Sequence, residues 1–246
     1  GFRRKPDSRP ADEAMAELPL KDADLLAPGA SHYRAFVGPP ERYDFIAASQ
    51  FALLFQLGLR DHNKVLDFGC GSLRLGRLLI PFLREAGYYG IDPNAWLIDE
   101  GIKHELGRSA ITIKKPCFSY NDDFDCGVFG EQFDFVIAQS IITHTGPDLL
   151  HKMLSTVSGA IAENGIFVFS YISDPHCTGL PSNGWHYPGC VGYSQPSMEE
   201  ILQQYGLSSI ELPWYHPGAR WCAAAPRKEN LPGLDVMVNL NGLAVR

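Results

Sequence analysis

Two closely spaced glycines lie between an apolar run and a helical pattern, within the sequence VLDFGCGSLRLG that spans Val65 to Gly76. Gly69 and Gly71 allow a tight turn, and because they lack a Cβ a ligand can approach the backbone closely. The helix that follows would present free N–H groups to that ligand. The spacing therefore predicts a ligand-binding loop between a strand and a helix.

The spacing around this loop separates classes of ligand. A dinucleotide fingerprint, G-x-G-x-x-G, would need its third glycine at position 74, where the chain has Arg74. Asp67 ends the strand before the loop, and Asp92 follows the next apolar run, 21 residues past Gly71. A carboxylate there can accept hydrogen bonds from both hydroxyls of a ribose. Because nicotinamide and adenosyl cofactors share that ribose, Asp92 alone leaves both open.

The motifs DFGCGSLRLG, YYGIDPN and FDFVIAQS, in this order and spacing, resemble the first motifs of class I S-adenosylmethionine-dependent methyltransferases. The resemblance spans roughly residues 43–170. It implies a doubly wound, Rossmann-like α/β fold with a mostly parallel seven-stranded sheet. It also implies S-adenosylmethionine as cofactor and S-adenosylhomocysteine as product. Leu73 stands where many members carry a third glycine, and we expect Gly76 to relieve helix packing instead.

The resemblance also implies a set of cofactor residues. The loop from Asp67 to Gly71 would hold the methionine part and Asp92 the ribose, while Gln139 would lie under the sulfonium. The full set is Asp67, Gly69, Cys70, Gly71, Asp92, Pro93, Asp123, Phe124 and Gln139, with Asp123 and Phe124 flanking the adenine. Asp92 and Pro93 could instead begin a helix. The acids around Asp123 could bind a metal, but we expect a solvated turn and no metal site.

Acceptor residues are expected in the loops after the fourth and fifth predicted strands, because ligands of doubly wound sheets bind beyond the carboxyl ends of the strands. A histidine suits removal of a proton from a hydroxyl acceptor. His144 is the first candidate base and His186 the second, although each could instead be a packing residue. The aromatic residues predicted to wall a flat or sugar-like acceptor are Tyr43, Tyr171, Trp185 and Tyr187.

Two classes of nucleic-acid acceptor are disfavoured. Enzymes of this kind that methylate amines of bases carry an Asn/Asp-Pro-Pro-aromatic run after the fourth strand, where this chain has AQSII. Those that attack cytosine need a Pro-Cys nucleophile there, which is also missing. The net charge of -7, from 21 Lys and Arg against 28 Asp and Glu, disfavours a nucleic-acid partner further. We expect methylation of a small molecule, at a hydroxyl.

The predicted elements that position these residues alternate between strands and helices. Strands are predicted at Lys64–Phe68, Tyr88–Ile91, Ile111–Lys114, Phe133–Ala138, Ile166–Ile172, Ser208–Leu212 and Trp221–Ala225. Helices are predicted at Glu41–Leu57, Leu73–Ala86, Ala95–Leu106, Pro147–Ala162 and Met198–Tyr205. Helices between strands imply parallel pairing with right-handed crossovers.

The chain divides into an N-terminal arm and one domain. Residues 1–40 hold six of the 18 prolines and are predicted to form an extended arm with a helical patch near Asp12–Leu18. The methyltransferase domain would cover 41–246, with a helical lid at 41–58 and a cofactor-binding half at 59–172. Residues 173–246 would supply the acceptor loop and the C-terminal strands.

The composition indicates which partners and which cellular compartment to expect. The longest apolar stretch, Leu78 to Leu83, is too short to span a membrane, so we expect no membrane partner. Six cysteines without a CxxC pair and an N-terminus without a signal-peptide pattern favour free thiols in the cytoplasm. A homodimer is left open. Alternatives to small-molecule methylation are a protein or peptide methyltransferase, a nicotinamide-dependent oxidoreductase, and a non-catalytic module that keeps the fold for binding.

Overall fold

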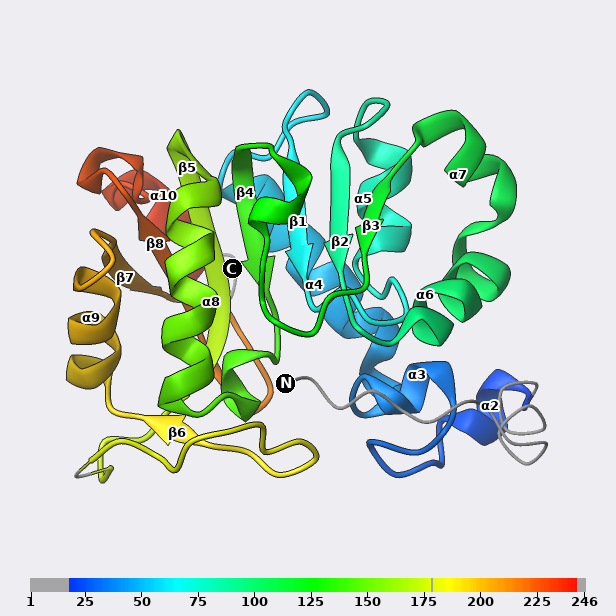
Figure 1. Cartoon of the computed structure of the whole chain (residues 1–246), viewed down its shortest axis with the longest axis horizontal. Coiled ribbons are helices and arrows are strands. Elements are labelled where there is room, and N and C mark those ends of the chain that lie inside the picture. The colour runs from blue at the N-terminus through cyan, green and yellow to red at the C-terminus, as the bar shows by residue number, and fades with distance from the viewer. Residues whose placement is uncertain (1–17, 178, 243–246) are drawn as a thin grey trace.

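A central sheet with helices on both faces organises the chain, in a computed structural model that describes residues 18–177 and 179–242 (Figure 1). Its strands are β1 (Val65–Phe68), β2 (Tyr88–Ile91), β3 (Cys117–Ser119), β4 (Phe133–Ala138), β5 (Ile161–Ser173), β6 (Gly192–Tyr193), β7 (Ser208–Leu212) and β8 (Arg220–Ala225). Seven of them follow the order β3-β2-β1-β4-β5-β8-β7, and the short β6 pairs with β5 beside this path.

The first five strands of the sheet run parallel, as the alternation of strands and helices predicts. β1 pairs in parallel with both β2 and β4, and β4 pairs in parallel with β5. β8 is antiparallel to β5 and to β7. The strand order therefore reverses between β1 and β4, and in doubly wound sheets ligands bind at this reversal, beyond the carboxyl ends of the strands. The predicted mostly parallel, doubly wound sheet is confirmed.

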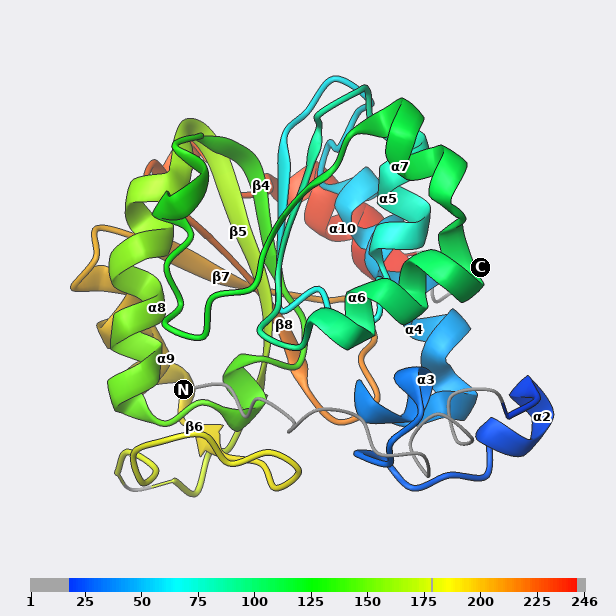
Figure 2. The same cartoon turned by 45° about the vertical axis from the view of Figure 1, so that its right-hand side comes forward.

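Helices cover the two faces of the sheet, as Figure 2 shows. One face carries α8 (Pro147–Ala160) and α9 (Gln195–Gln203). The other face carries α4 (Tyr43–Gln56), α5 (Gly76–Phe82), α6 (Ala95–Gly101), α7 (Arg108–Lys114) and α10 (Leu234–Gly242).

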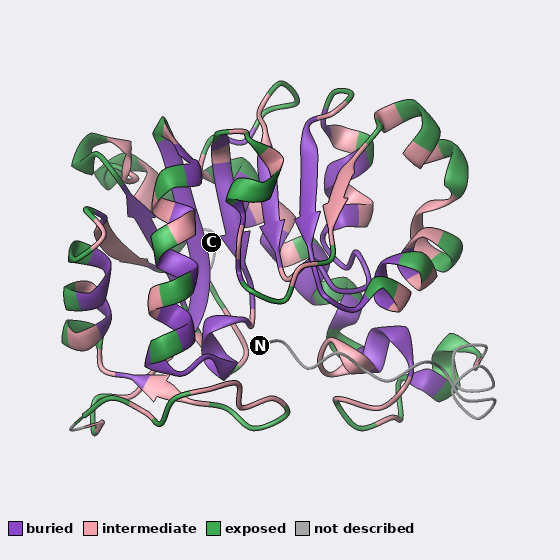
Figure 3. Ribbon diagram, in the orientation of Figure 1, coloured by how far each residue is buried: buried purple, intermediate pink, exposed green. Residues whose placement is uncertain are grey.

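Alternate residues of the central strands feed two separate cores, so these strands are buried on both faces (Figure 3). In β4, Val136 packs in the core under α8, whereas Phe135 and Ile137 pack in the core under α4 and α5. In β5, Phe167 and Val168 divide in the same way. Burial on both faces is the reason that these strands are nearly continuous apolar runs in the sequence.

Residues 18–40 correct the prediction of an extended arm. They contain α2 (Leu20–Ala23) and α3 (Tyr33–Phe36), and a 3-10 turn (Pro40–Arg42) leads into α4. Arg34 is buried, and its Nε donates to Glu105 Oε1 at 2.7 Å, while Tyr33 Oη donates to the same oxygen at 2.8 Å. These bonds fix α3 against the chain that follows α6. The predicted helical patch near Asp12–Leu18 lies, apart from Leu18, outside the described residues.

The third predicted strand is wrong, because its alternating residues belong to a helix. Ile111–Lys114 is the last turn of α7, which ends where Lys115 adopts the left-handed conformation with φ +46°. The strand that pairs with β2 comes directly afterwards, with Cys117 opposite Tyr89. The pattern of small, branched and charged residues here fits either structure, and the pairing with β2 decides between them.

Several helix bounds also differ from the prediction. α5 begins at Gly76 rather than at Leu73, because Leu73 has φ +60°, and it ends at Phe82 directly after Pro81. α6 continues as one π-helical turn (Ile102–Leu106). α10 is not predicted from the sequence. No helix within the described ranges is both long and apolar enough to cross a membrane.

Candidate functional site

A cavity of about 310 Å³ lies where the strand order reverses, beyond the carboxyl ends of β1, β2 and β4. Segments far apart in the sequence line it. They include Phe36, Val37, Arg42, Ile46, Gly69, Gly71, Arg74, Asp92, Asn94, Leu97, Gln139, Ser140, Ile141, Thr143, His144, Trp185, Tyr187, Cys190 and His216. Seven of the sequence-predicted site residues are in this lining: Gly69, Gly71, Asp92, Gln139, His144, Trp185 and Tyr187.

The two loop glycines are required by both conformation and space. Gly69 and Gly71 have φ values of +76° and +52°, in the left-handed region that favours glycine. A Cβ on Gly69 would lie 2.1 Å from Ile141 Cδ1, and a Cβ on Gly71 would lie 2.6 Å from Val37 Cγ1. The loop therefore offers bare backbone to the cavity.

Leu73 stands where the resemblance implies a third glycine, and it adopts a positive φ. Its φ of +60° is the conformation that a glycine adopts more easily, and its side chain is fully buried. A Cβ on Gly76 would lie 2.7 Å from the hydroxyl oxygen of Tyr88. Gly76 thus permits close packing of α5 on β2, which confirms the expectation from the sequence.

Asp92 is buried at the end of β2 and faces the cavity. Its Oδ2 accepts from the N–H of Gly71 at 3.0 Å, and its Oδ1 accepts from the backbone N–H and the side-chain amide of Asn94 at 2.9 and 3.0 Å. Burial raises the pKa of Asp92, and these donors oppose the shift. The carboxylate is thereby oriented, and the acceptor site left on Oδ2 can take a hydrogen bond from a ribose hydroxyl.

Asp67 and Cys70 lie behind the loop instead of lining the cavity. Tyr88 Oη donates to Asp67 Oδ2 at 2.8 Å, and burial raises the pKa of Asp67 to about 7. The Cys70 thiol is buried, and burial raises its pKa. Pro93 is also outside the lining. These residues support the loop from beneath.

Asp123 and Phe124 are also outside the cavity lining. The ring of Phe124 stacks on Phe68 in the core, with ring centroids 5.8 Å apart, and Asp123 accepts from the N–H of Asp125 at 3.2 Å. Within the described residues, no group of three or more His, Cys, Asp or Glu side chains is arranged to hold a metal ion.

His144 follows β4 in a 3-10 turn (Ile142–His144), and its ring is held by the chain that follows β5. Its Nδ1 lies 2.6 Å from the carbonyl oxygen of Gly189, and its ring meets those of Trp185 and Tyr187 at 5.6 and 4.9 Å. A carbonyl only accepts, so Nδ1 carries the proton and Nε2 is the basic atom. Burial lowers the pKa of His144, which keeps the ring neutral near pH 7.

Three sequence-predicted acceptor residues lie outside the cavity, which corrects the prediction for them. Nε2 of His186 lies 2.9 Å from the carbonyl oxygen of Ser182. The Tyr43 hydroxyl is buried and donates to the carbonyl oxygen of Ser72 at 2.9 Å. The Tyr171 hydroxyl donates to Glu211 Oε1 on β7 at 2.6 Å. Each side chain is committed to a structural hydrogen bond, which its residue type alone does not predict.

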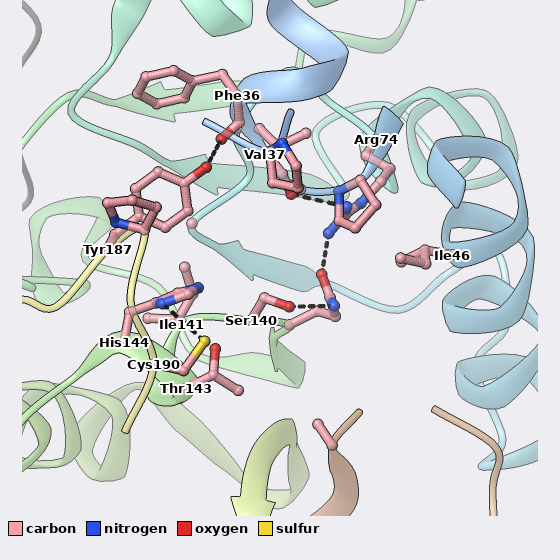
Figure 4. Close-up of a pocket in the computed structure, with 18 of the residues that line it drawn as sticks. Phe36, Val37, Ile46, Arg74, Ser140, Ile141, Thr143, His144, Tyr187 and Cys190 are labelled. Carbon is pink, nitrogen blue, oxygen red and sulfur yellow. Dashed lines mark hydrogen bonds between the residues drawn. The ribbon is translucent and has the colours of Figure 1, made fainter. Parts of the chain in front are cut away.

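Sequence reasoning missed a polar group at the opposite end of the cavity, shown in Figure 4. Arg74 Nη1 donates to the carbonyl oxygen of Val37 at 3.0 Å, and its Nη2 donates to Gln139 Oε1. Gln139 Nε2 in turn donates to Ser140 Oγ at 2.6 Å and lies 3.2 Å from His216 Nε2. In the sequence, Arg74 stands out only because it occupies the position of a fingerprint glycine, and His216 lies in no recognisable motif.

Comparison with known proteins identifies the family and the fold of the chain. The model of a family described as "Methyltransferase domain" matches residues 40–212. No curated protein matches the chain.

Solved methyltransferase structures share the fold. DhpI, in a complex with S-adenosylhomocysteine, is 22% identical with a TM-score of 0.57, and the match covers 88% of this chain and 98% of that chain. Magnesium protoporphyrin IX methyltransferase from Synechocystis PCC 6803, solved with bound S-adenosylmethionine, is 17% identical with a TM-score of 0.57, covering 76% and 81%. The N-methyltransferase NodS from Bradyrhizobium japonicum WM9 is 14% identical with a TM-score of 0.53, covering 73% and 87%.

At these identities the structures establish the fold alone, and it is the Rossmann-like class I methyltransferase fold that the sequence motifs resemble. Family membership rests on the match to the family model, which extends over more than half of the residues. The chain therefore belongs to this family of methyltransferase domains.

Proposed function

We propose that the chain binds S-adenosylmethionine in the central cavity and transfers its methyl group to a hydroxyl of a small-molecule acceptor. When bound, this cofactor supplies an electrophilic methyl group on a sulfonium and leaves as S-adenosylhomocysteine. Support comes from the family match and from two structures of the same fold that are described with S-adenosylmethionine or S-adenosylhomocysteine bound.

The residues of the cavity fit this cofactor. Asp92 would accept a hydrogen bond from a ribose hydroxyl at Oδ2, because Gly71 and Asn94 orient the carboxylate and leave that site open. Gly69 and Gly71 line the cavity and would lie against the methionine part, and a Cβ on either would instead meet Ile141 or Val37. Gln139 at the end of β4 would lie beside the sulfonium, as the family resemblance implies. Asp123 and Phe124 remain the proposed neighbours of the adenine.

The observation that carries the hydroxyl proposal is the hydrogen bond between His144 Nδ1 and the carbonyl oxygen of Gly189. Because Nδ1 is occupied by this carbonyl oxygen, Nε2 is free to take a proton. An acceptor hydroxyl that loses its proton to Nε2 as it attacks the methyl carbon would leave an imidazolium, stabilised by the bond to Gly189. Holding the acceptor in line and removing its proton are the two tasks that methyl transfer to a hydroxyl requires of a protein.

The walls of the cavity support a small acceptor. The cofactor and the acceptor would share a volume of about 310 Å³, near the lower end of the range for small-molecule sites, which leaves little room for the acceptor. Two segments close over the cavity, since the hydroxyl of Tyr187 donates to the carbonyl oxygen of Phe36 (Figure 4). Trp185 and Tyr187 place aromatic rings beside His144, a surface suited to a flat or sugar-like molecule.

Transfer of a labelled methyl group tests this function. The purified chain is incubated with methyl-labelled S-adenosylmethionine and matched sets of small alcohols and phenols, small amines, and peptides. The proposal predicts label in the hydroxyl set and loss of that transfer in His144→Gln. Label in the peptide set alone would contradict it, as would transfer to amines that His144→Gln leaves unchanged.

A further inference from the structure

Arg74 is a buried cation that forms no ion pair with a described carboxylate. Only 8% of the residue is exposed, and the two groups that accept hydrogen bonds from its guanidinium, the carbonyl oxygen of Val37 and Gln139 Oε1, are both neutral. The buried Arg34 differs, since it pairs with Glu105 and Asp44. Arg77, one turn past Arg74, pairs with the same two acids.

An unpaired charge in this position is costly to the folded protein. Burial lowers the pKa of Arg74, which reflects the loss of water around the guanidinium. Buried cations are ordinarily matched by an anion because hydrogen bonds to neutral acceptors replace only part of the lost hydration. A protein that retains such a residue in the wall of a ligand cavity gains from it when a ligand brings the missing charge.

The charges around the cavity are unbalanced at the same end. Among the described residues that line it, Asp92 is the one carboxylate, and it faces the proposed ribose position. Arg42 also lines the cavity and pairs with Glu41 at 3.7 Å, whereas Arg74 lines it without an ion pair to a described acid. Burial and the charge of Arg74 lower the pKa of His216 to about 4. The charge of Asp67, behind the glycine loop, acts on the guanidinium of Arg74, but the two groups form no ion pair. Nδ1 of His216 is itself buried without a hydrogen-bond partner.

We infer that Arg74 is the binding residue for an oxyanion, a carboxylate or a phosphate group, carried by a ligand of this cavity. The guanidinium offers a planar fork of N–H donors that matches such a group in a bidentate contact. In binding, the oxyanion would share or replace the neutral acceptors at Val37 and Gln139. Because Val37 belongs to the segment that covers the glycine loop, the same contact would link occupancy of the cavity to the position of that segment.

This inference rests on the proposed function, because that function determines which ligands could carry the oxyanion. The methionine part of the cofactor carries a carboxylate, and Arg74 is close to the loop proposed to hold that part. An acidic acceptor would carry its own carboxylate or phosphate, between Arg74 and His216. The chemistry of recognition is the same in both cases, so the experiment must separate the two sources.

Calorimetric titration of the full chain with three probes separates them. S-adenosylhomocysteine carries the carboxylate, and 5′-methylthioadenosine carries the same nucleoside and a thioether without it. Inorganic phosphate is titrated into protein both free and saturated with S-adenosylhomocysteine. Wild type is compared with Arg74→Gln and with Arg77→Gln, which makes the same change of charge at a neighbouring arginine that is already paired.

The inference predicts that Arg74→Gln weakens binding only of probes that carry an oxyanion, by at least about tenfold. A loss for S-adenosylhomocysteine with unchanged binding of methylthioadenosine assigns the oxyanion to the cofactor. A loss confined to phosphate on the saturated protein assigns it to the acceptor. Arg77→Gln is expected to retain the wild-type preference among probes, and unchanged methylthioadenosine binding reports that the fold is intact.

Equal binding of S-adenosylhomocysteine and of phosphate by wild type and Arg74→Gln would overturn the inference while leaving the proposed function standing. If wild type binds neither nucleoside, the proposed function fails, and phosphate binding to the free protein with and without Arg74 still decides the inference. Should Arg74→Gln not fold, Arg74→Lys keeps the charge but not the planar fork, and a smaller loss with the same selectivity is expected.

Discussion

Nδ1 of His144 lies 2.6 Å from the backbone carbonyl oxygen of Gly189, which joins the turn after β4 to the segment between β5 and β6. This hydrogen bond sets the tautomer of the candidate base and helps to hold the chain that covers it. The N–H of His186 donates in return to the carbonyl oxygen of His144 at 2.8 Å. The two histidines are thus neighbours with different tasks, one facing the cavity and one bound to Ser182.

This difference predicts opposite outcomes for the same substitution. His144→Gln should lower turnover by roughly 10²–10⁴-fold, because a glutamine cannot take a proton. His186→Gln, in the same segment of the structure, should leave turnover close to wild type. Steady-state rates with an accepted hydroxyl substrate measure both. Equal rates for wild type and His144→Gln would show that His144 only packs, and a large loss in His186→Gln alone would reverse the assignment.

The pH dependence of the reaction follows from the same environment. Burial lowers the pKa of His144 below its ordinary 6.5, although the bond to Gly189 opposes the shift. A base must be deprotonated to act, so kcat/KM should fall only as pH drops through this lowered pKa, and should be flat from pH 7 upward. The acidic limb should disappear in His144→Gln. A limb centred above pH 7 that survives the substitution would contradict the role.

Gly69→Ala tests the bare backbone of the loop, with Gly58→Ala as its matched control. Both glycines have positive φ, so each alanine should cost roughly 1 kcal/mol of stability or somewhat more from backbone conformation. Only at Gly69 does the new Cβ meet another side chain, that of Ile141, whereas Gly58 has open space. Calorimetry should find S-adenosylhomocysteine binding lost in Gly69→Ala and retained in Gly58→Ala. Equal affinity in both variants would remove the loop from the site.

Asp67→Asn should change how the stability of the ligand-free protein depends on pH. Burial raises the pKa of Asp67 to about 7 from 3.8, so the folded state holds this proton more tightly than the unfolded state. The resulting stabilisation is present below pH 4 and is lost as pH rises through 7. An amide keeps the bond from Tyr88 without ionising, so the variant should gain melting temperature over wild type by a few degrees more at pH 8 than at pH 5.

Thermal unfolding at the two pH values measures this gain, with the exposed Asp99→Asn as the control. The control should differ from wild type by the same amount at pH 5 and pH 8. If Asp67→Asn also shows no change between the two pH values, Asp67 is ionised throughout and its assigned environment is wrong.

The positions of the loop glycines and of Asp92 in the cavity lining could be predicted from the sequence because their signals are local. Gly69, Gly71 and Asp92 lie directly after strands whose apolar runs are unmistakable, so their place at one edge of the sheet follows from parallel pairing. The alternating residues of α7 fit either a helix or a strand, so the sequence alone does not decide between them. There the strand lies three residues later, at Cys117, and only its pairing with Tyr89 reveals it.

The other side of the site depends on contacts between distant residues. Arg74 meets Val37 and Gln139, which lie 37 and 65 positions away, and neither partner is recognisable from residue type. Tyr43 is the opposite case, a residue for which the sequence predicts a ligand contact. It is an aromatic residue at the start of a helix that is predicted to cover the acceptor. Its hydroxyl is instead satisfied by the carbonyl oxygen of Ser72. Long-range hydrogen bonds decide that Arg74 lines the cavity and Tyr43 does not, and such bonds are not visible in a single sequence.

Calorimetric titration of the purified chain with S-adenosylhomocysteine, with NADH in parallel, tests the central claim most directly. The account predicts saturable binding of one S-adenosylhomocysteine per chain, no binding of NADH, and loss of the first in Asp92→Ala. Binding of NADH alone would contradict the claim that the cavity binds S-adenosylmethionine. So would S-adenosylhomocysteine binding that Asp92→Ala leaves unchanged.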